Sequence, residues 1–435
     1  MRVEKRQATG SLWRDRDFLI FWCAQTLSVA GDSFALIAVP LLVLNVTGSV
    51  TQMGVLTGVS GAASVAAGVF AGVLADRFDR RRLLVICDVV RLVLYATIPV
   101  VWAFGEHVWL LYALLPPAAG VGMVFQVTYV ASVRSLAGEQ RVTEANGMLY
   151  ATAAAAGILG PTLAGVVAGH LGATAAIAIN AASFGLSALG VLLTRASRYA
   201  VEPAETAGLA RTPGTAGTAG TAGTEEAGTA SERRPWRELL AGAGFLVRQP
   251  VLRTLTVLLS FFIFMTLGLT DIVIFRLKHD LGQADSVVGL VLGVGAAGTM
   301  VGSMLVARVR RSLGFGPTWI GAQVVSGLAI LGLGLAGSVW GVAAIMALYL
   351  ACVSLAGICS MSLRQQVTPP HLLGRVTSAF WTIHFSLGPV GAAVLGWGAG
   401  TYGATTVFVF AGASCLVLAL TALFTPVRQR HPERA

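Results

Sequence analysis

Long apolar segments alternate with short polar ones along almost the whole chain. Each apolar segment has about 20 residues or more, enough to cross a ~30 Å hydrocarbon layer as an α-helix. Twelve segments meet this criterion: residues 18–44, 53–74, 83–104, 108–131, 145–169, 173–193, 251–275, 287–307, 317–337, 340–363, 376–398 and 404–424. Several connections have only three to eight residues, so consecutive helices must run antiparallel. The pattern predicts an all-α membrane protein with twelve transmembrane helices.

Composition agrees with this interpretation. Of the 435 residues, 55% are hydrophobic and 11% are charged, whereas soluble proteins have about 25% charged residues. The five cysteines all lie inside apolar segments and have no metal-ligand spacing, so we expect small buried side chains and no metal site.

The net charge of +10 reports orientation rather than a nucleic-acid partner. With both termini on one side, every Arg and Lys except Arg91, Arg276 and Lys278 falls on that side. The positive-inside rule then predicts a multi-pass protein of the cell membrane with both termini cytoplasmic. The charged start of the chain and the long first apolar segment predict no cleaved signal peptide.

A polar linker divides the twelve segments into two groups of six. It contains Thr-Ala-Gly repeats, which cannot bury enough apolar surface to order the chain, so most of it should be disordered. A short interfacial helix is expected from about Trp236 to Arg248. The predicted parts are a cytoplasmic N-terminus (1–17), a six-helix bundle (18–195), the cytoplasmic linker (196–250), a second six-helix bundle (251–424) and a cytoplasmic tail (425–435).

The two groups of helices look like repeats. Arg134 closes one apolar segment and Gly160-Pro161 lies in the next, while Arg364 and Gly388-Pro389 have the same relation in the second half. Two pseudo-symmetric six-helix bundles with a seam between them suit a rocking transporter.

The connection at 72–83, between the second and third apolar segments, carries the sharpest motif. Its Gly-x-Leu-Ala-Asp-Arg-x-x-Arg-Arg order resembles the signature loop of major facilitator superfamily transporters. The resemblance implies the fold of that superfamily and a cytoplasmic gate in which Asp76 is the acid and Arg80 and Arg81 its basic partners. Gly72 and Arg77 complete the motif. A cluster that only sets topology is the alternative, and Asp79 departs from the glycine usual in the family.

The fifth segment is similar to the antiporter motif of the superfamily's exporters. Gly147, Gly160, Pro161 and Gly165 match it, whereas Ala156 and Ala164 replace two of its glycines. Small residues allow close helix crossing, and proline kinks the helix. The resemblance implies export rather than uptake; ordinary small-residue packing is the alternative.

Two acidic residues inside the spans are candidates for proton coupling. Each buried charge costs at least ~2.5–3.5 kcal/mol at mid-depth unless it is paired or hydrated. Asp32 lies near the midplane of the first span and can take up and release protons; a carboxylate tied structurally to amides or serine is the alternative. Asp271 lies nearer the outer end of the seventh span, where pairing with Arg276 or Lys278 is an equal alternative.

Further charged groups are expected to build the cytoplasmic gate. Asp88 and Arg91 are one helical turn apart, a spacing that allows a local ion pair. We expect them to join Asp76 and Arg134 in one cytoplasmic-side network. His384 could shuttle protons, although a packed neutral histidine is the more common case.

The substrate cavity should lie between the halves near the midplane. Its candidate lining residues are Gln25, Phe34, Gln126, Tyr129, Phe261, Phe264, Trp381 and Phe385. They predict a roomy, mostly apolar cavity suited to amphiphilic drugs or natural products.

The sequence therefore predicts a proton-coupled exporter of apolar or amphipathic small molecules, resembling the drug/proton antiporter branch that includes macrolide-efflux and enterobactin-exporter proteins. It is not expected to be an enzyme, and we expect a monomer with no cofactor beyond the proton gradient. A siderophore or lysophospholipid carrier of the same fold and a non-transporting membrane receptor or scaffold are the alternatives. An ATP-driven pump would need a phosphate loop ending in Lys-Ser or Lys-Thr, and both lysines, Lys5 and Lys278, lack that successor.

Overall fold

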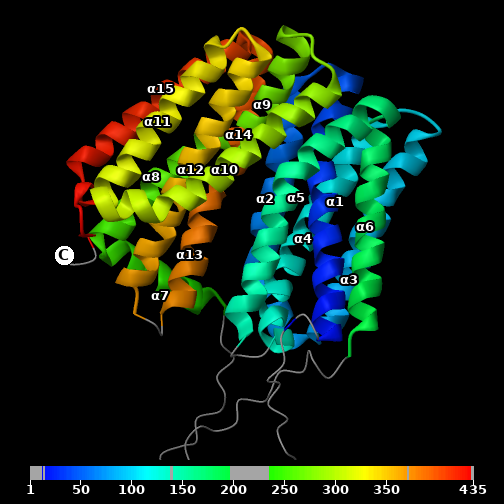
Figure 1. The fold of residues 1–435 in the computed structure, drawn as a ribbon, viewed down its shortest axis with the longest axis horizontal. Coiled ribbons are helices and arrows are strands. Elements are labelled where there is room, and N and C mark those ends of the chain that lie inside the picture. The colour runs from blue at the N-terminus through cyan, green and yellow to red at the C-terminus, as the bar shows by residue number, and fades with distance from the viewer. Residues whose placement is uncertain (1–11, 13–14, 138–140, 196–234, 370–371, 433–435) are drawn as a thin grey trace, which may run out of the picture.

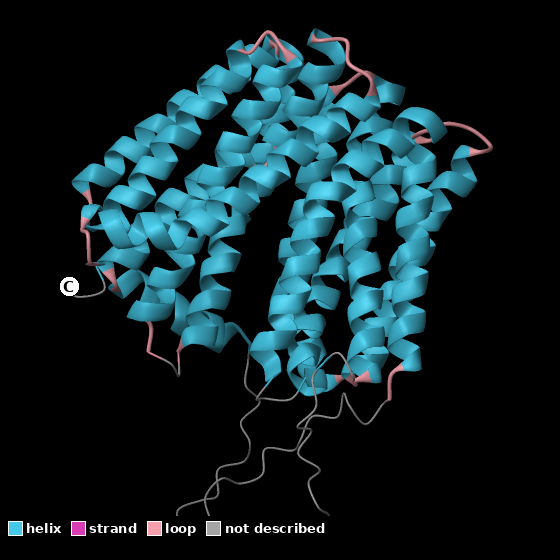
Figure 2. Cartoon of the chain, viewed as in Figure 1, coloured by secondary structure: helices cyan, strands magenta, loops and turns pink. Residues whose placement is uncertain are grey.

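The computed structural model describes residues 12, 15–137, 141–195, 235–369 and 372–432. Within these ranges the chain forms twelve helical spans that are long and apolar enough to cross a membrane. Figure 2 shows helices throughout, with the connecting loops gathered at the two ends of the helices. The prediction of an all-α protein with twelve transmembrane helices is therefore confirmed.

The first six spans form one bundle of unbroken helices. They are α1 (Arg16–Thr47), α2 (Val50–Arg77), α3 (Arg80–Trp102), α4 (Val108–Ala137), α5 (Val142–Leu171) and α6 (Ala173–Leu193). Helix α1 packs between α5 and α6, while α3 packs against α4 and α6, and α2 against α4.

The second bundle follows a short helix, α7 (Pro235–Arg248), at the place where the sequence predicts one. Its helices are α8 (Pro250–Thr266), α9 (Leu269–Phe275), α10 (Asp285–Leu313), α11 (Phe315–Leu335), α12 (Val339–Val367), α13 (Leu373–Ser386), α14 (Gly388–Tyr402) and α15 (Ala404–Thr421). The seventh span is broken: α8, α9 and a π-helical turn (Arg276–Asp280) follow one another. The eleventh is broken as well, into α13 and α14, and the break falls at the Gly388-Pro389 pair.

Tight turns join the helices at the end of the molecule opposite α7. Gly48 ends α1 with a φ of 63°, a value that L side chains rarely adopt, and Ser49 then caps α2 by accepting a hydrogen bond from the Gln52 amide. Gly172 between α5 and α6 and Gly403 between α14 and α15 have φ values of 87° and 85°. The same turn thus recurs at corresponding places in the two bundles.

We call the end that carries α7 the linker face and the end that carries Gly48, Gly172 and Gly403 the far face. The two bundles lean together at the far face (Figure 1). Two seams join them there: α5 packs on α10, and α2 packs on α14.

Glycines bring the backbones of the two bundles into direct contact at both seams. A Cβ atom on Gly289 would lie 2.6 Å from the Cα of Gly165, and one on Gly54 would lie 2.9 Å from the Cα of Gly396. Contacts this close are impossible for any larger residue, so glycine is required if the helices are to cross at this distance.

The same helices are free of such contacts nearer the linker face. A Cβ atom on Gly72 of α2, or on Gly147 or Gly157 of α5, would meet no other atom within 4 Å. The glycines of α2 and α5 therefore pack closely on the second bundle at the far face and have open space beside them nearer the linker face.

We predict that Gly289→Ala lowers thermal stability, whereas Gly157→Ala does not. The added methyl at position 289 collides with the Gly165 backbone, and overpacking of this kind costs about 1–3 kcal/mol. At position 157 the methyl has open space, and it reduces the backbone entropy of the unfolded chain. That variant should therefore gain up to about 1 kcal/mol in the free energy of unfolding. Thermal unfolding of the two variants in detergent tests the difference, and equal melting temperatures would contradict it.

Candidate functional site

A cavity of about 510 Å³ lies within the first bundle, between α1, α2, α3, α4 and α5. It is lined by Gln25, Thr26, Ser28, Val29, Asp32, Ser64, Arg91, Tyr95, Ala118, Ala119, Gly122, Met123, Phe125, Gln126, Tyr129, Val130, Val133, Asn146, Leu149, Thr152 and Ala153. Asn146 lies near the start of α5, at the linker face, whereas Asp32 lies halfway along α1. The cavity therefore extends from the middle of the membrane-spanning region toward the linker face.

An ion pair between Asp32 and Arg91 marks the deep end of the cavity. The Arg91 Nη2 atom donates to Asp32 Oδ1 at 2.6 Å. The Arg91 side chain is 9% exposed, but the Asp32 side chain is 45% exposed. One carboxylate oxygen thus holds the arginine, and the carboxylate still borders the open cavity.

Aromatic rings fix the guanidinium of Arg91 from its other sides. The Arg91 Cζ atom lies 3.8 Å from the centre of the Phe184 ring and 5.8 Å from that of Phe125. Cation–π contacts contribute roughly 0.5–2 kcal/mol each, with the larger values at desolvated positions. Arg91 therefore has two contacts that do not depend on its bond to Asp32.

The close approach of α1 and α6 brings Phe184 near the pair. A Cβ atom on Gly31 would collide with the Ser183 side chain, so only glycine allows this crossing. Gly31 precedes Asp32 and Ser183 precedes Phe184 in the sequence. Their contact thus brings Phe184 close to the Asp32–Arg91 pair.

The expected ion pair between Asp88 and Arg91 is not formed, because Arg91 turns to Asp32 on α1 instead. Asp88 is fully buried, with the Ser187 hydroxyl beside it. The Arg91 side chain reaches across to α1, where its Nη2 atom bonds to Asp32 at 2.6 Å. Arg91 belongs to the cavity and not to a network at the linker face.

Asp271 lies away from this cavity, near the far face, and is 5% exposed. Neither of its expected cationic partners is bonded to it. Arg276 donates to the Thr405 hydroxyl and the Ala336 carbonyl, and Lys278 pairs with Asp285 at 2.5 Å. Asp271 instead accepts a 2.6 Å hydrogen bond from the hydroxyl of Thr57 in the other bundle.

The loop at 72–83 joins α2 to α3 at the linker face. Asp79, the departure from the family's glycine, caps α3 by accepting from the Arg82 amide at 2.8 Å. Arg81 donates to the Val191 and Leu192 carbonyls at the end of α6. Arg77 is exposed and Arg80 is partly buried. The side chains of Asp76 and Arg134 lie outside the described part of the structure.

The residues of the antiporter motif on α5 have separate neighbours. A Cβ atom on Gly160 would collide with the Ser33 side chain of α1, one residue from Asp32. Gly165 contacts Gly289 at the far-face seam, and Gly147 is exposed with open space beside it. Pro161 lies within α5, which continues through it. The motif therefore packs the helix against α1 at one point and against the other bundle at another.

Three of the eight predicted cavity residues line this cavity, namely Gln25, Gln126 and Tyr129. Phe34 does not, because it packs against the main hydrophobic core. The remaining four, Phe261, Phe264, Trp381 and Phe385, belong to α8 and α13 of the second bundle and do not border the cavity.

An aromatic cluster surrounds His384 on α13. The His384 ring stacks on Phe380, with centroids 5.3 Å apart, and lies next to Trp381 and Phe385. The Arg364 Cζ atom lies 3.5 Å from the centre of the Phe380 ring. A packed histidine in the second bundle is thus the arrangement found. Across the described residues, no group of three or more His, Cys, Asp or Glu side chains could hold a metal ion.

The sequence did not single out several residues of the cavity. Tyr95, Asn146 and Thr152 border it, and Phe184 supports Arg91 from behind. Tyr95 follows Arg91 by four residues and therefore lies on the same helix face, which was a usable signal. About half of the lining residues carry a hydrogen-bonding side chain, so the cavity is more polar than predicted.

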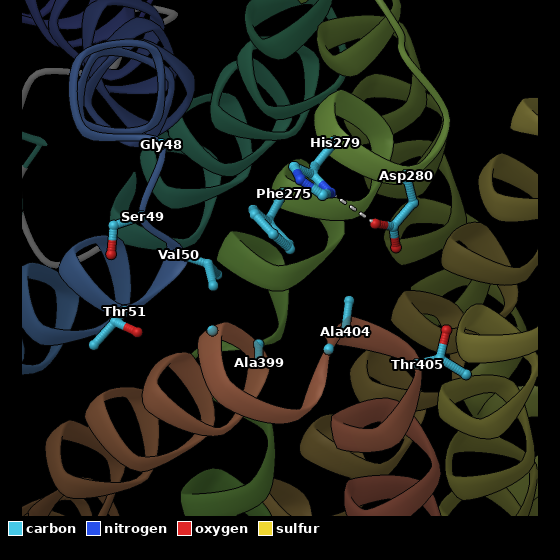
Figure 3. Close-up of a pocket in the computed structure, with 12 residues that line it drawn as sticks. Gly48, Ser49, Val50, Thr51, Phe275, His279, Asp280, Ala399, Ala404 and Thr405 are labelled. Atoms are coloured by element: carbon cyan, nitrogen blue, oxygen red, sulfur yellow. Dashed lines mark hydrogen bonds and ion pairs between the residues drawn. The ribbon is translucent and has the colours of Figure 1, made fainter.

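A second, smaller pocket of about 470 Å³ opens at the far face between the bundles. Figure 3 shows Ser49, Val50 and Thr51 on one side of it, with Phe275 and the hydrogen-bonded His279 and Asp280 across from them. It lies over the α2–α14 seam, far from the cavity that holds Asp32.

Known transporters resemble this chain over much of its length. The Multidrug efflux pump Tap of Mycobacterium tuberculosis (strain ATCC 25618 / H37Rv) is 28% identical over 181 residues, which are 40% of this chain and 43% of Tap. The chain therefore matches less than half of Tap. The Enterobactin exporter EntS of Citrobacter koseri is 24% identical over 395 residues, covering 87% of this chain and 84% of EntS.

Solved structures share the fold at low identity. The nucleoside transporter NupG superposes with a TM-score of 0.72 at 13% identity, covering 94% of this chain and 98% of NupG. A bacterial homologue of the human lysosomal transporter Spinster, in an inward-facing and unoccupied conformation, gives 0.68 at 15% identity, with 98% of both chains covered. Residues 21–390 match the family model of the Major Facilitator Superfamily. The chain belongs to the Major Facilitator Superfamily and is a transporter rather than an enzyme.

Proposed function

We propose that this transporter exports amphipathic small molecules in exchange for protons, with its linker face in the cytoplasm of a cell whose membrane it spans as a monomer. It needs no cofactor beyond the proton gradient. The observation that carries the proposal is the Asp32–Arg91 ion pair, because it places a titratable carboxylate at mid-depth in a cavity that extends toward one face.

The orientation follows from the distribution of basic residues. Among the residues that the structure describes, every Arg and Lys except Arg91, Arg276 and Lys278 belongs to the linker-face side of the twelve spans. Because cytoplasmic loops are enriched in Arg and Lys, the linker face is assigned to the cytoplasm. In the present arrangement the cavity then takes substrate from the cytoplasmic side.

Proton exchange would act through the pair in the following way. A proton on Asp32 removes its negative charge and breaks the ion pair, while Phe184 and Phe125 keep Arg91 in position. Loss of the proton restores the pair. The wall of the cavity thus alternates between a neutral ion pair and an unpaired arginine. A substrate that binds the deprotonated, ion-paired form better than the protonated one drives release of the proton.

The lining indicates an amphipathic substrate. Val29, Phe125 and Leu149 offer apolar surface, whereas Gln126 and Asn146 offer amide groups. Similarity to the efflux pump Tap and to the exporter EntS supports export as the direction of transport.

A siderophore is the second candidate substrate. It is favoured by the polar share of the lining and by the resemblance to EntS over most of both chains. A siderophore carries many hydrogen-bonding groups, which the polar side chains of this cavity can match, while an apolar drug would leave them unpaired.

A substrate panel tests the function directly. Cells that lack or overproduce the protein are exposed to toxic compounds and tested for siderophore release, each with and without a protonophore. The proposal predicts that overproduction protects against amphipathic compounds and that the protonophore abolishes the protection. Protection that survives the protonophore would rule out proton coupling, and siderophore release alone would select the second candidate.

We expect Asp32→Asn to abolish gradient-driven efflux, because the amide cannot carry a proton between the two faces. In vesicles with an imposed pH gradient, the rate should fall at least tenfold, whereas substrate binding in detergent persists. Glu106→Gln is the matched control, since it removes an exposed carboxylate from the far-face loop between α3 and α4. Gradient-driven efflux that survives in Asp32→Asn would refute the coupling role.

We also predict a measurable coupling energy between Asp32 and Arg91. A double-mutant cycle combines Asp32→Asn and Arg91→Gln, with the free energy of unfolding measured by reversible unfolding in mixed micelles. The coupling energy should be about 1–2 kcal/mol. This is below the stability of about 3–5 kcal/mol that is lost when one partner of a fully buried pair is removed. The reduction reflects the hydration of Asp32, whose side chain is 45% exposed. A coupling energy of zero would mean that the two side chains do not interact in solution.

A further inference from the structure

A single hydrogen bond joins a buried carboxylate of one bundle to a hydroxyl of the other. Thr57 on α2 donates through its Oγ1 atom to Oδ2 of Asp271 on α9, at 2.6 Å. Asp271 is 5% exposed. No ion pair of Asp271 occurs among the described residues, because the nearby cations are engaged elsewhere: Arg276 with Thr405 and Ala336, and Lys278 with Asp285.

The bond lies inside the α2–α14 seam. Residues before and after Thr57 contact the second bundle: Gly54 meets Gly396, and a Cβ atom on Gly58 would lie 3.4 Å from the Pro389 carbonyl carbon. Gly268, where the seventh span breaks, brings α9 close to α14, since its Cβ atom would lie 2.9 Å from the Cα of Ala392. The break thus positions Asp271 opposite α2.

The far-face pocket overlies this bond. Thr51 lines the pocket and precedes Thr57 by six residues, or about 9 Å along α2. Phe275 lines it as well and follows Asp271 by one helical turn. Val50, Phe275 and Ala399 line the pocket as well (Figure 3). Asp271 does not line the pocket and is 5% exposed, so it is shielded from external water.

We infer that the Thr57–Asp271 hydrogen bond is a latch of the far-face gate, made while the cavity opens to the linker face and broken when the transporter opens to the far face. This inference rests on the alternating access of the proposed function. When α2 and α14 separate, Thr57 leaves, and water that enters through the pocket takes its place at the carboxylate.

The energetics favour such a role. A buried carboxylate that loses its hydrogen-bond donor without gaining water is strongly destabilised, so the bond resists partial opening of the seam. Full opening admits water and removes that penalty. The latch therefore favours the two end states over intermediates. Thr51 adds a weaker contact nearer the surface, where its hydroxyl donates to the Gly396 carbonyl at 3.3 Å.

The test measures the conformational equilibrium, without substrate or gradient. Spin labels at Leu171→Cys and Ala284→Cys, in a background without the five native cysteines, report opening across the other seam, because both residues are exposed, one where α5 ends and the other just before α10. Distances between the labels are measured in lipid nanodiscs for each variant. The parent should show mainly the short distance.

Removing either partner should populate the long distance. Hydrogen bonds to charged groups contribute about 1.5–3 kcal/mol, so Thr57→Val and Asp271→Ala should each raise the ratio of far-open to closed molecules about tenfold or more. The double variant should show no additional shift, since both changes remove the same bond. Asp271→Asn should shift the ratio less, because its amide oxygen still accepts from Thr57.

The control is Thr256→Val, which removes a buried hydroxyl that donates within its own helix to Leu252. It should leave the distance distribution unchanged. An unchanged ratio in Thr57→Val, or shifts that add in the double variant, would overturn the latch. These outcomes are independent of the efflux assays: absent proton-driven efflux in the parent would overturn the proposed function while the distances still report on the latch.

Discussion

The direct contact of backbones at the far face is the constraint on which the rest of the structure depends. Lipid provides no hydrophobic force that holds two bundles together, so their association depends on close packing and interhelical hydrogen bonds. Gly165 with Gly289, and Gly54 with Gly396, provide that packing at one end only. The cavity of the first bundle, which α1 to α5 line, extends toward the opposite end. Close packing at one end and a cavity toward the other agree with the proposed entry of substrate from the linker face.

The charged pair at the deep end of the cavity offsets the cost of placing charges inside the membrane-spanning region. An isolated carboxylate or guanidinium at this depth would be costly, and the Asp32–Arg91 bond offsets the cost for both. A fully dry pair would be inert, since breaking it would leave two uncompensated charges. Here the carboxylate borders the cavity with its side chain 45% exposed, and Phe184 contacts the arginine independently of it. The carboxylate is therefore reachable from the cavity, a condition that the proposed coupling role requires.

Much of the fold could be predicted from the sequence, but the pairing of charges could not. Segment length and hydropathy determined the twelve spans, because a bilayer imposes a minimum length on every helix. Spacing along one helix identifies neighbours such as Asp88 and Arg91, and Arg91 nevertheless bonds to another helix. The sequence also does not give the rotation of a helix about its axis, which decides whether a side chain faces the cavity or the core. Phe34 packs against the core and does not line the cavity. No sequence signal marked Thr57, whose role depends on its position opposite the break in the seventh span.

The two carboxylates on corresponding helices of the repeat have opposite surroundings in this one state. Asp32 of the first span has a half-exposed side chain and borders the cavity, while Asp271 of the seventh span is 5% exposed beneath the closed far-face seam. A rigid-body rocking motion that opened the far face would separate the seam that covers Asp271. Their partners differ accordingly: Asp32 has a cation within its own bundle, and Asp271 has a hydroxyl across the seam. The two corresponding helices therefore carry one acid whose partner lies within its own bundle and one whose partner lies across the seam, the arrangement on which the proposed coupling and latch roles rest.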